Sequence, residues 1–189
     1  MADVLLLHSA LGLRPGVLAF AERLRGSGHA VTSPDLYDGE VFDQAEDGVP
    51  HMRRVGWELL VERAEAAASA MPGAFAVVGM SMGAGLAGHL VATRRPVRAA
   101  VLLYSGEPPD GPWPQGVPVQ VHHTVGDPWA DVASSSALVA AVARSGSAAE
   151  LHLYPGSRHL LDDADLPTHH DPAAVALMWP RVEAFLAAL

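Results

Sequence analysis

Short apolar runs alternate with helix-like segments along the chain, and this alternation restricts the fold more than any other feature. The apolar runs are rich in valine, leucine and alanine and occupy residues 3–9, 29–36, 74–80, 97–105, 117–124 and 149–156. Several are apolar on both faces, as strands of a helix-covered parallel sheet must be. The segments between them carry apolar residues at helical spacing, at 15–27, 52–71, 82–95, 132–145 and 172–189.

Strict alternation of strands and helices favours right-handed crossovers and a doubly wound α/β sheet. We predict six parallel strands with helices on both faces, and the 189 residues fit one domain, 1–189, better than two. Two irregular stretches, 37–50 and 106–116, each follow a predicted strand. They therefore lie at the carboxyl edge of the sheet, where such folds bind ligands. The five carboxylates of 37–50 indicate a solvated loop rather than a metal site.

Composition excludes several classes of protein. The formal charge of −9 argues against nonspecific nucleic-acid binding, which needs a basic face. The absence of cysteine excludes disulfides, thiolate metal sites and a cysteine nucleophile. The first residues lack the features of a signal peptide, and no uncharged apolar run approaches the length of about 18 residues needed to span a bilayer. We expect a soluble cytoplasmic protein without a membrane partner.

The sequence "GMSMG" at 79–83 lies between a predicted strand and a predicted helix, which is the context of a nucleophile elbow. In such a turn the serine has strained backbone angles, and side chains two residues before and after it would collide with neighbouring backbone. Ser81 would thus be exposed above the sheet at the start of a helix, with the amide of Met82 facing a developing oxyanion. The alternative is a glycine-rich turn without chemistry. An elbow after the third strand also predicts the strand order 2-1-3-4-5-6.

A serine hydroxyl needs a histidine base and an acid that orients it, and in this fold the chain order is serine, acid, histidine. Asp127 lies just past the end of the strand at 117–124, and His159 just past the end of the next strand. Asp131 is a second candidate for the acid, although its place near a helix start fits an N-terminal cap equally well. The sequence therefore predicts Ser81, Asp127 and His159 as a catalytic triad.

Six other histidines are interpreted as structural or solvent-exposed residues: His29, His89, His122, His123, His169 and His170. Adjacent side chains such as His169 and His170 seldom point to one centre, so we expect no metal there. Nothing in the sequence implies a cofactor. The second oxyanion donor should come from the loop after the first strand, where the backbone amides of Ser9, Ala10 and Leu11 are all candidates.

Four segments together resemble the dienelactone hydrolase family of α/β-hydrolases. They are the opening at 5–39, which ends in Pro-Asp-Leu-Tyr-Asp-Gly, "GMSMGAG" at 79–85, "HHTVGDPW" at 122–129 and "YPGSRHLL" at 154–161. The resemblance covers nearly the whole chain. It implies the α/β-hydrolase fold, a triad of Ser81, Asp127 and His159, and an oxyanion hole formed by the amides of Ala10 and Met82.

The chain also departs from that family's pattern. Where the named members have a cysteine at the elbow, this chain has Ser81, and where they have a glutamate after the first-strand histidine, it has Ser9. The arginines that hold the dienelactone carboxylate have no secure counterpart, since Arg53 and Arg54 are only in the right neighbourhood. The resemblance therefore implies the fold and the hydrolytic groups, but not dienelactone as the substrate.

These observations predict a serine hydrolase acting on a small carboxylic ester, lactone or thioester, as a monomer or homodimer. No insertion is large enough for a lid, so we expect an open site. Residues in or near loops at the carboxyl edge are candidates for its wall, or for simple packing: Leu11, Tyr37, Trp113 and Trp129. Two alternatives stay open, a non-catalytic binding protein on the same scaffold and an acyltransferase.

Overall fold

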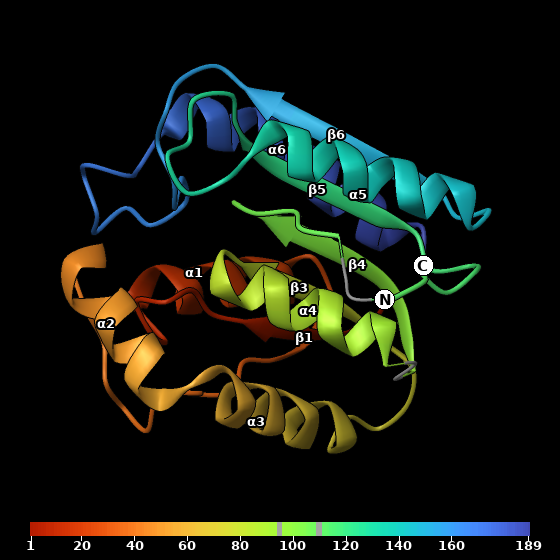
Figure 1. Cartoon of the computed structure of the whole chain (residues 1–189), viewed down its shortest axis with the longest axis horizontal. Coiled ribbons are helices and arrows are strands. Elements are labelled where there is room, and N and C mark those ends of the chain that lie inside the picture. Colours follow the sequence, from red (N-terminus) through yellow and green to blue (C-terminus); the bar gives the residue numbers. More distant parts are fainter. Residues whose placement is uncertain (94–95, 109–110) are drawn as a thin grey trace.

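A single sheet of six parallel strands forms the centre of the protein (Figure 1). The computed structural model describes residues 1–93, 96–108 and 111–189. The strands are β1 (Asp3–Leu7), β2 (Ala30–Thr32), β3 (Phe75–Met80), β4 (Val97–Leu103), β5 (Val119–Thr124) and β6 (Ala149–Tyr154). All neighbouring pairs are parallel and the spatial order is β2-β1-β3-β4-β5-β6. The predicted doubly wound sheet and its strand order are confirmed.

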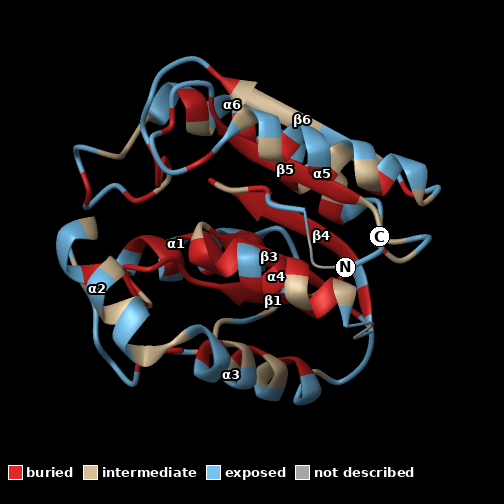
Figure 2. Cartoon of the chain, viewed as in Figure 1, coloured by how far each residue is buried: buried red, intermediate tan, exposed pale blue. Residues whose placement is uncertain are grey.

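Helices cover both faces of this sheet. They are α1 (Pro15–Gly26), α2 (Ala45–Val55), α3 (Trp57–Ser69), α4 (Met82–Ala92), α5 (Val132–Arg144) and α6 (Pro172–Ala187). One apolar core joins the sheet to α3, α4 and α5, and a second joins its other face to α1 and α6. Buried residues accordingly concentrate on the strands and on the helix faces turned toward them (Figure 2).

Successive strand residues supply the two cores in turn, because side chains alternate across a strand. Leu5 and Leu7 of β1 belong to the core under α3–α5, whereas Val4 and Leu6 belong to the core under α1 and α6. Strand β3 is buried at all six positions. These strands therefore show the continuous apolar runs expected of a sheet covered on both faces.

One helix prediction was wrong. The segment 52–71 was expected to be a single helix and 37–50 to be irregular, but α2 begins at Ala45 and Gly56 separates it from α3. Gly56 has φ 86°, a conformation that glycine adopts at little cost, and it ends α2. Pro50 and the carboxylates at the start of α2 are more typical of a loop, and for this reason the first part of the helix was not predicted. Its acidic first turn and basic last turn both suit the helix dipole.

Parts of two predicted segments lie outside the described residues: positions 94–95 of the helix 82–95 and positions 109–110 of the irregular stretch 106–116. Over the ranges that are described, no helix has both the length and the apolar character required to cross a lipid bilayer.

Candidate active site

Ser81 connects the end of β3 to the start of α4 in a sharp turn. Its backbone angles are φ 54° and ψ −110°, outside the regions that residues other than glycine normally occupy. The Ser81 N–H donates to the carbonyl of Leu103 at 2.8 Å, and its carbonyl accepts from the N–H of Ala84 at 2.8 Å. The neighbouring strand and the new helix thus fix the strained residue from both sides.

The glycines on either side are required by contact with backbone. A Cβ atom on Gly79 would lie 2.2 Å from the carbonyl oxygen of Gly83, and one on Gly83 would lie 2.3 Å from that of Leu7. Both distances are far below van der Waals contact. The Gly-x-Ser-x-Gly spacing is therefore the spacing that this turn needs.

Three side chains from separate loops meet above this turn. The ring of His159 contacts the Ser81 hydroxyl through Nε2 at 2.8 Å and the Asp127 carboxylate through Nδ1 at 2.7 Å. Because an ionised carboxylate only accepts hydrogen bonds, Nδ1 carries a proton, and in the neutral ring Nε2 is then free to accept from the hydroxyl. The structure brings together the three residues that the sequence predicted as a triad.

Asp127 and His159 are held by contacts between their loops. The second oxygen of Asp127 accepts from the backbone N–H of Trp129 at 2.8 Å. The hydroxyl of Thr124, at the end of β5, donates to the carbonyl of Arg158 at 2.9 Å, and the N–H of Gly126 donates to the carbonyl of Gly156 at 2.9 Å. The acid and the histidine are therefore carried by one hydrogen-bonded pair of loops.

The alternative acid, Asp131, has a different role. Its carboxylate accepts from the N–H groups of Ala133 and Ser134 at 3.2 and 2.9 Å, which makes it the N-cap of α5. The hydrogen bond from the Ser134 amide is the main cause that lowers the pKa of Asp131. Asp35 likewise accepts from the backbone of its own loop, at Tyr37 and Gly39.

The loop after β1 offers backbone donors beside Ser81. His8 fixes this loop, because its Nδ1 donates to the carbonyl of Ser9 at 2.7 Å and its Nε2 accepts from the N–H of Leu36 at 3.0 Å. Burial lowers the pKa of His8, which keeps the ring neutral. The Leu11 amide donates to the Ser9 hydroxyl at 3.2 Å. Within the described part of the chain, no hydrogen bond uses the amides of Ala10 or Met82, so these two are available to a ligand.

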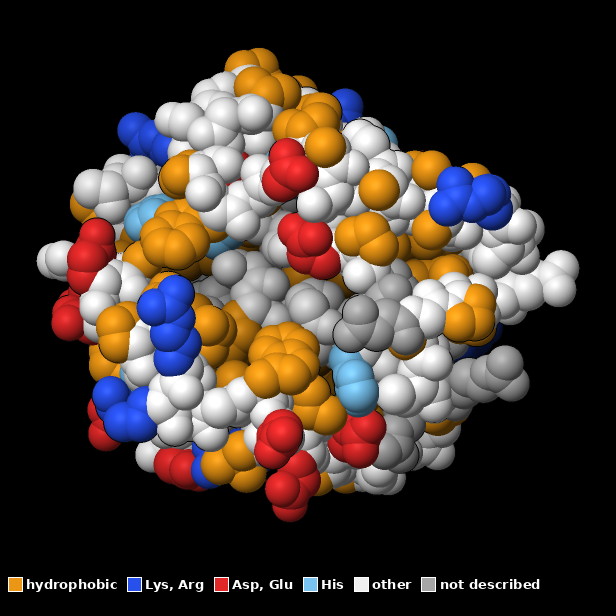
Figure 3. Space-filling view, in the orientation of Figure 1, with side chains coloured by type: hydrophobic (Ala, Val, Ile, Leu, Met, Phe, Trp, Pro, Cys, Tyr) orange, Lys and Arg blue, Asp and Glu red, His pale blue; other side chains and the backbone are white. Residues whose placement is uncertain are grey.

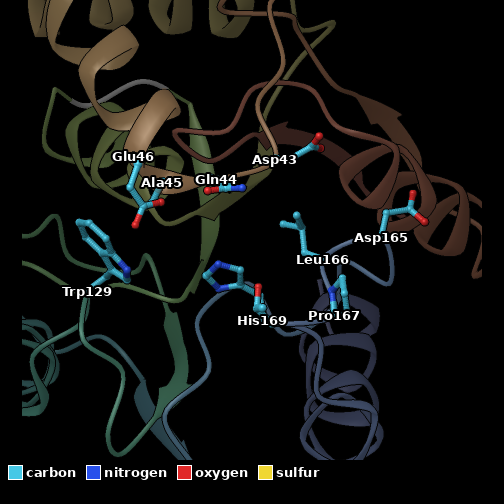
Figure 4. Close-up of a pocket in the computed structure, with 10 residues that line it drawn as sticks. Asp43, Gln44, Ala45, Glu46, Trp129, Asp165, Leu166, Pro167 and His169 are labelled. Carbon is cyan, nitrogen blue, oxygen red and sulfur yellow. The ribbon is translucent and has the colours of Figure 1, made fainter.

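A cleft leads away from Ser81. Its inner pocket, of about 40 Å³, is lined by Ser9, Ala10, Leu11, Ala45, Val49, Ser81, Trp129, His159, Leu160 and His169. It shares Ala45, Trp129 and His169 with an outer cavity of about 610 Å³ (Figure 4). In the space-filling view, hydrophobic side chains border much of the hollow that crosses this face, and basic side chains are dispersed rather than gathered (Figure 3).

Comparison with known families identifies the protein class. The model of the dienelactone hydrolase family matches residues 2–189. The chain belongs to the dienelactone hydrolase family. The predicted resemblance is thereby confirmed, and the members of this family are hydrolases.

Solved structures agree with this assignment at the level of the fold. A dienelactone hydrolase-like promiscuous phosphotriesterase from metagenomic libraries is 21% identical, with a TM-score of 0.80, over 100% of this chain and 87% of the other. A phospholipase/carboxylesterase from Dyadobacter fermentans is 18% identical, with a TM-score of 0.63, over 87% and 86%. A cold-adapted esterase from an Arctic intertidal metagenomic library is 18% identical, with a TM-score of 0.64, over 98% and 82%. No match to this sequence is found among curated proteins.

The residues proposed for the wall of this dienelactone hydrolase-type site divide into two groups. Leu11 and Trp129 line the inner pocket. Tyr37 and Trp113 do not line it and are only 2% and 4% exposed, because both belong to the core under α3–α5. The Tyr37 hydroxyl contacts the sulfur of Met82 at 3.3 Å, and the Trp113 ring donates to the carbonyl of Val117 at 2.7 Å. Both aromatic side chains thus support the fold instead of facing the cleft.

Sequence reasoning missed part of the cleft. His169 was interpreted as a structural or exposed residue, yet it lines both the pocket and the cavity, with its ring centre 6.4 Å from that of His159. Ala45 and Val49 of α2 were assigned to a solvated loop and line the pocket as well. No local pattern marks these residues, because the folding of distant loops brings them to the cleft.

Five further histidines form structural contacts. In β5, His122 and His123 are fully buried and hydrogen-bonded, and His29 accepts from the N–H of Ala2 at 3.3 Å. His89 contacts Glu65 at 3.0 Å, and His170 donates to the carbonyl of Leu161 at 2.8 Å.

Proposed function

We propose that this hydrolase cleaves a small carboxylic ester, lactone or thioester with Ser81 as the nucleophile. The continuous hydrogen-bonded chain Ser81–His159–Asp127 at a strained turn is the observation that carries the proposal. A serine positioned in this way has its base already in contact, and the base has its orienting acid. Esterases among proteins of similar fold support the same reaction class.

The first half of the reaction forms an acyl-enzyme. The Oγ of Ser81 attacks the carbonyl carbon while Nε2 of His159 accepts the hydroxyl proton. Asp127 stays ionised and stabilises the imidazolium that results. The backbone amides of Ala10 and Met82 donate to the oxyanion of the tetrahedral intermediate. The intermediate then collapses, and His159 gives its proton to the departing alcohol or thiol.

The second half regenerates the serine. A water molecule attacks the acyl-enzyme carbonyl while His159 again accepts a proton, and the second tetrahedral intermediate releases the carboxylic acid and Ser81. The inner pocket holds about 40 Å³ and is bordered by Leu11, Val49 and Leu160. A pocket of this size favours a short apolar group beside the reacting carbonyl.

Four variants test these roles with p-nitrophenyl esters of increasing acyl length. We expect Ser81→Ala and His159→Ala to remove nearly all turnover, and by similar amounts, because triad members act as a unit. Asp127→Asn should lower kcat on the order of 10⁴-fold, since it spoils the histidine tautomer. Asp131→Asn is the matched control, with the same chemical change four residues further on, and should keep most activity. Melting temperatures show that each variant is folded.

The alternatives predict other outcomes. A binding protein would not turn over any ester in wild-type form, and an acyltransferase would transfer the acyl group to an added alcohol in preference to water. Full activity in folded Ser81→Ala would contradict the serine mechanism. A severe loss in Asp131→Asn with a mild loss in Asp127→Asn would reassign the acid.

A further inference from the structure

The outer cavity continues the cleft beyond Ser81, and its charged side chains are acidic. It is lined by Asp43, Gln44, Ala45, Glu46, Trp129, Asp165, Leu166, Pro167, Thr168 and His169. Because it shares three residues with the inner pocket, it offers space for the extended part of a substrate whose carbonyl lies at Ser81. Three carboxylates line the cavity, whereas the described lining residues include neither lysine nor arginine.

Two of these carboxylates are free to act on a ligand. Asp43 is paired with the buried Arg14 at 2.5 Å. Glu46 and Asp165 form no ion pair within the described residues. His169 does not compensate for them, because burial and then the nearby His159 lower the pKa of His169 and leave its ring neutral near pH 7.

An exposed aromatic surface lies beside these charges. Trp129 is 52% exposed, and its indole lines the same cavity as Glu46 (Figure 4). His169 borders this cavity together with Glu46 and Trp129. An indole face and a carboxylate that border one cavity together favour a cation, and quaternary ammonium groups are bound in this way.

One feature of the cavity favours anions instead, and it is already compensated. Helix α2 begins at Ala45, and the N-terminus of a helix attracts negative charge. The first turn carries two carboxylates, and Asp47, which does not line the cavity, supplies negative charge to the helix N-terminus from the protein itself. Arg53 and Arg54, which resemblance placed near a carboxylate-binding position, do not line the cavity and are exposed in the last turn of α2.

We propose that the outer cavity selects substrates whose extended part carries a cationic amine, with Glu46 and Trp129 as the specificity-determining residues. This inference rests on the proposed ester hydrolysis at Ser81 and adds a substrate class to it. The preferred substrate is an ester with a quaternary or protonated amine several bonds from the carbonyl. A substrate with a carboxylate in that position is disfavoured.

Two matched substrate series test the selection, because either side of the ester can occupy the cavity. The acyl series uses p-nitrophenyl esters of 4-(trimethylammonio)butanoate, 5,5-dimethylhexanoate and glutarate, which place a cation, a neutral group of the same shape and an anion at one spacing. The alcohol series compares acetylcholine with 3,3-dimethylbutyl acetate. In the series that occupies the cavity, kcat/KM for the cation should exceed that of its neutral counterpart by roughly five- to tenfold.

Variants locate the effect. Glu46→Gln and Trp129→Leu should each reduce the cation-to-neutral ratio by about threefold or more. Asp47→Asn is the matched control, because it removes the same charge from the same helix turn at a residue that does not line the cavity, and it should keep the wild-type ratio. Added salt should lower the ratio, since exposed charges are screened.

The outcomes separate the two proposals. Hydrolysis of the neutral esters with a cation-to-neutral ratio near one in both series would overturn the charge selection and leave the serine hydrolase standing. A ratio that Asp47→Asn reduces as much as Glu46→Gln would assign the effect to the overall charge and overturn the site. If the wild-type protein cleaves none of the esters, the proposed function fails and the selection fails with it.

Discussion

At the scale of single residues, Ser81 occupies a conformation that opposes folding. A residue other than glycine in such a region costs on the order of 1–3 kcal/mol, and the cost persists only where the surroundings enforce it. Here the carbonyl of Leu103 and the first turn of α4 enforce it. The hydroxyl contacts His159 and contributes no cap to the helix. The strained backbone is therefore explained by the need to direct the Ser81 side chain toward His159.

The glycines around Ser81 give a stability prediction. Gly83→Ala places a methyl group 2.3 Å from the carbonyl oxygen of Leu7, and we expect it to lower the free energy of unfolding by about 1–3 kcal/mol. Gly88→Ala is the matched control in the same helix, because its new Cβ meets no atom within 4 Å apart from the backbone of its own helix and its chain neighbours. It should raise the free energy of unfolding by about 0.5–1 kcal/mol. Urea denaturation of both variants measures the difference, and equal effects would contradict the role of the close contact.

At the scale of secondary structure, the sequence predicted best the candidate catalytic residues that lie directly after a strand. Asp127 and His159 could be selected because the carboxyl ends of parallel strands meet at one edge, so residues just past two strand ends lie close together. The strand order followed from the alternation of strands and helices together with the elbow after the third strand. The glycines of the elbow could be interpreted from the sequence, because a backbone clash allows no other residue at their positions.

The residues that α2 and the connection after β6 contribute to the cleft could not be predicted from strand ends. Helix α2 contains Pro50 and four charged residues, so the part of it up to Pro50 was expected to be irregular, and packing decides its conformation. His169 reaches the cleft from a long connection after β6, which has no periodicity to interpret. An aromatic side chain in a loop was also not enough to predict a residue of the cleft wall, since Tyr37 and Trp113 pack in the core whereas Trp129 faces the cavity.

Arg14 joins elements on both sides of the cleft. It precedes α1 and donates to the buried carboxylate of Asp163 at 2.8 Å, to Asp43 at 2.5 Å and to the carbonyl of Phe42 at 2.7 Å. Asp163 belongs to the connection after β6, whereas Phe42 and Asp43 precede α2. One buried guanidinium thus ties together the segments that border the outer cavity.

This arrangement predicts a large and partly reversible loss of stability. Arg14→Met leaves Asp163 buried without its partner and should lower the free energy of unfolding by about 3–5 kcal/mol. Adding Asp163→Asn should restore part of it, because the uncompensated charge is removed. Arg25→Met, which breaks the exposed pair with Glu22, is the control and should cost about 1 kcal/mol or less. Chemical denaturation checks this, and equal losses in Arg14→Met and Arg25→Met would contradict it.

At the scale of the whole molecule, buried histidines link folding to pH. His122 accepts from the Tyr154 hydroxyl at Nδ1, at 2.8 Å, and donates from Nε2 to the Gln120 side chain at 3.1 Å, which is the pattern of a neutral ring. Burial is the main cause that lowers the pKa of His122 to about 3. The unfolded chain binds a proton at this residue near its ordinary pKa of 6.5, but the folded chain does not until the pH approaches 3.

Stability should therefore fall as the pH is lowered from about 6.5 toward 3, because the unfolded state binds more protons over this window. One such histidine contributes up to about 1.4 kcal/mol per pH unit to the slope. We expect His122→Gln to have a shallower slope than the wild type, whatever its stability at neutral pH. Urea denaturation at pH 7, 6, 5 and 4 measures the slopes, with His89→Gln as the control on α4. An unchanged slope in His122→Gln would exclude this residue as the cause.

Covalent labelling with a fluorophosphonate tests the central claim most directly, because the reagent reacts with a serine only when a base activates it. The predicted result is the addition of one phosphonyl group per chain, located by peptide mapping on Ser81, with loss of ester hydrolysis in proportion to labelling. Labelling should be absent in folded Ser81→Ala and should proceed at the wild-type rate in Asp131→Asn. Attachment to another residue, or hydrolysis that continues in fully labelled protein, would contradict the assignment of Ser81 as the nucleophile.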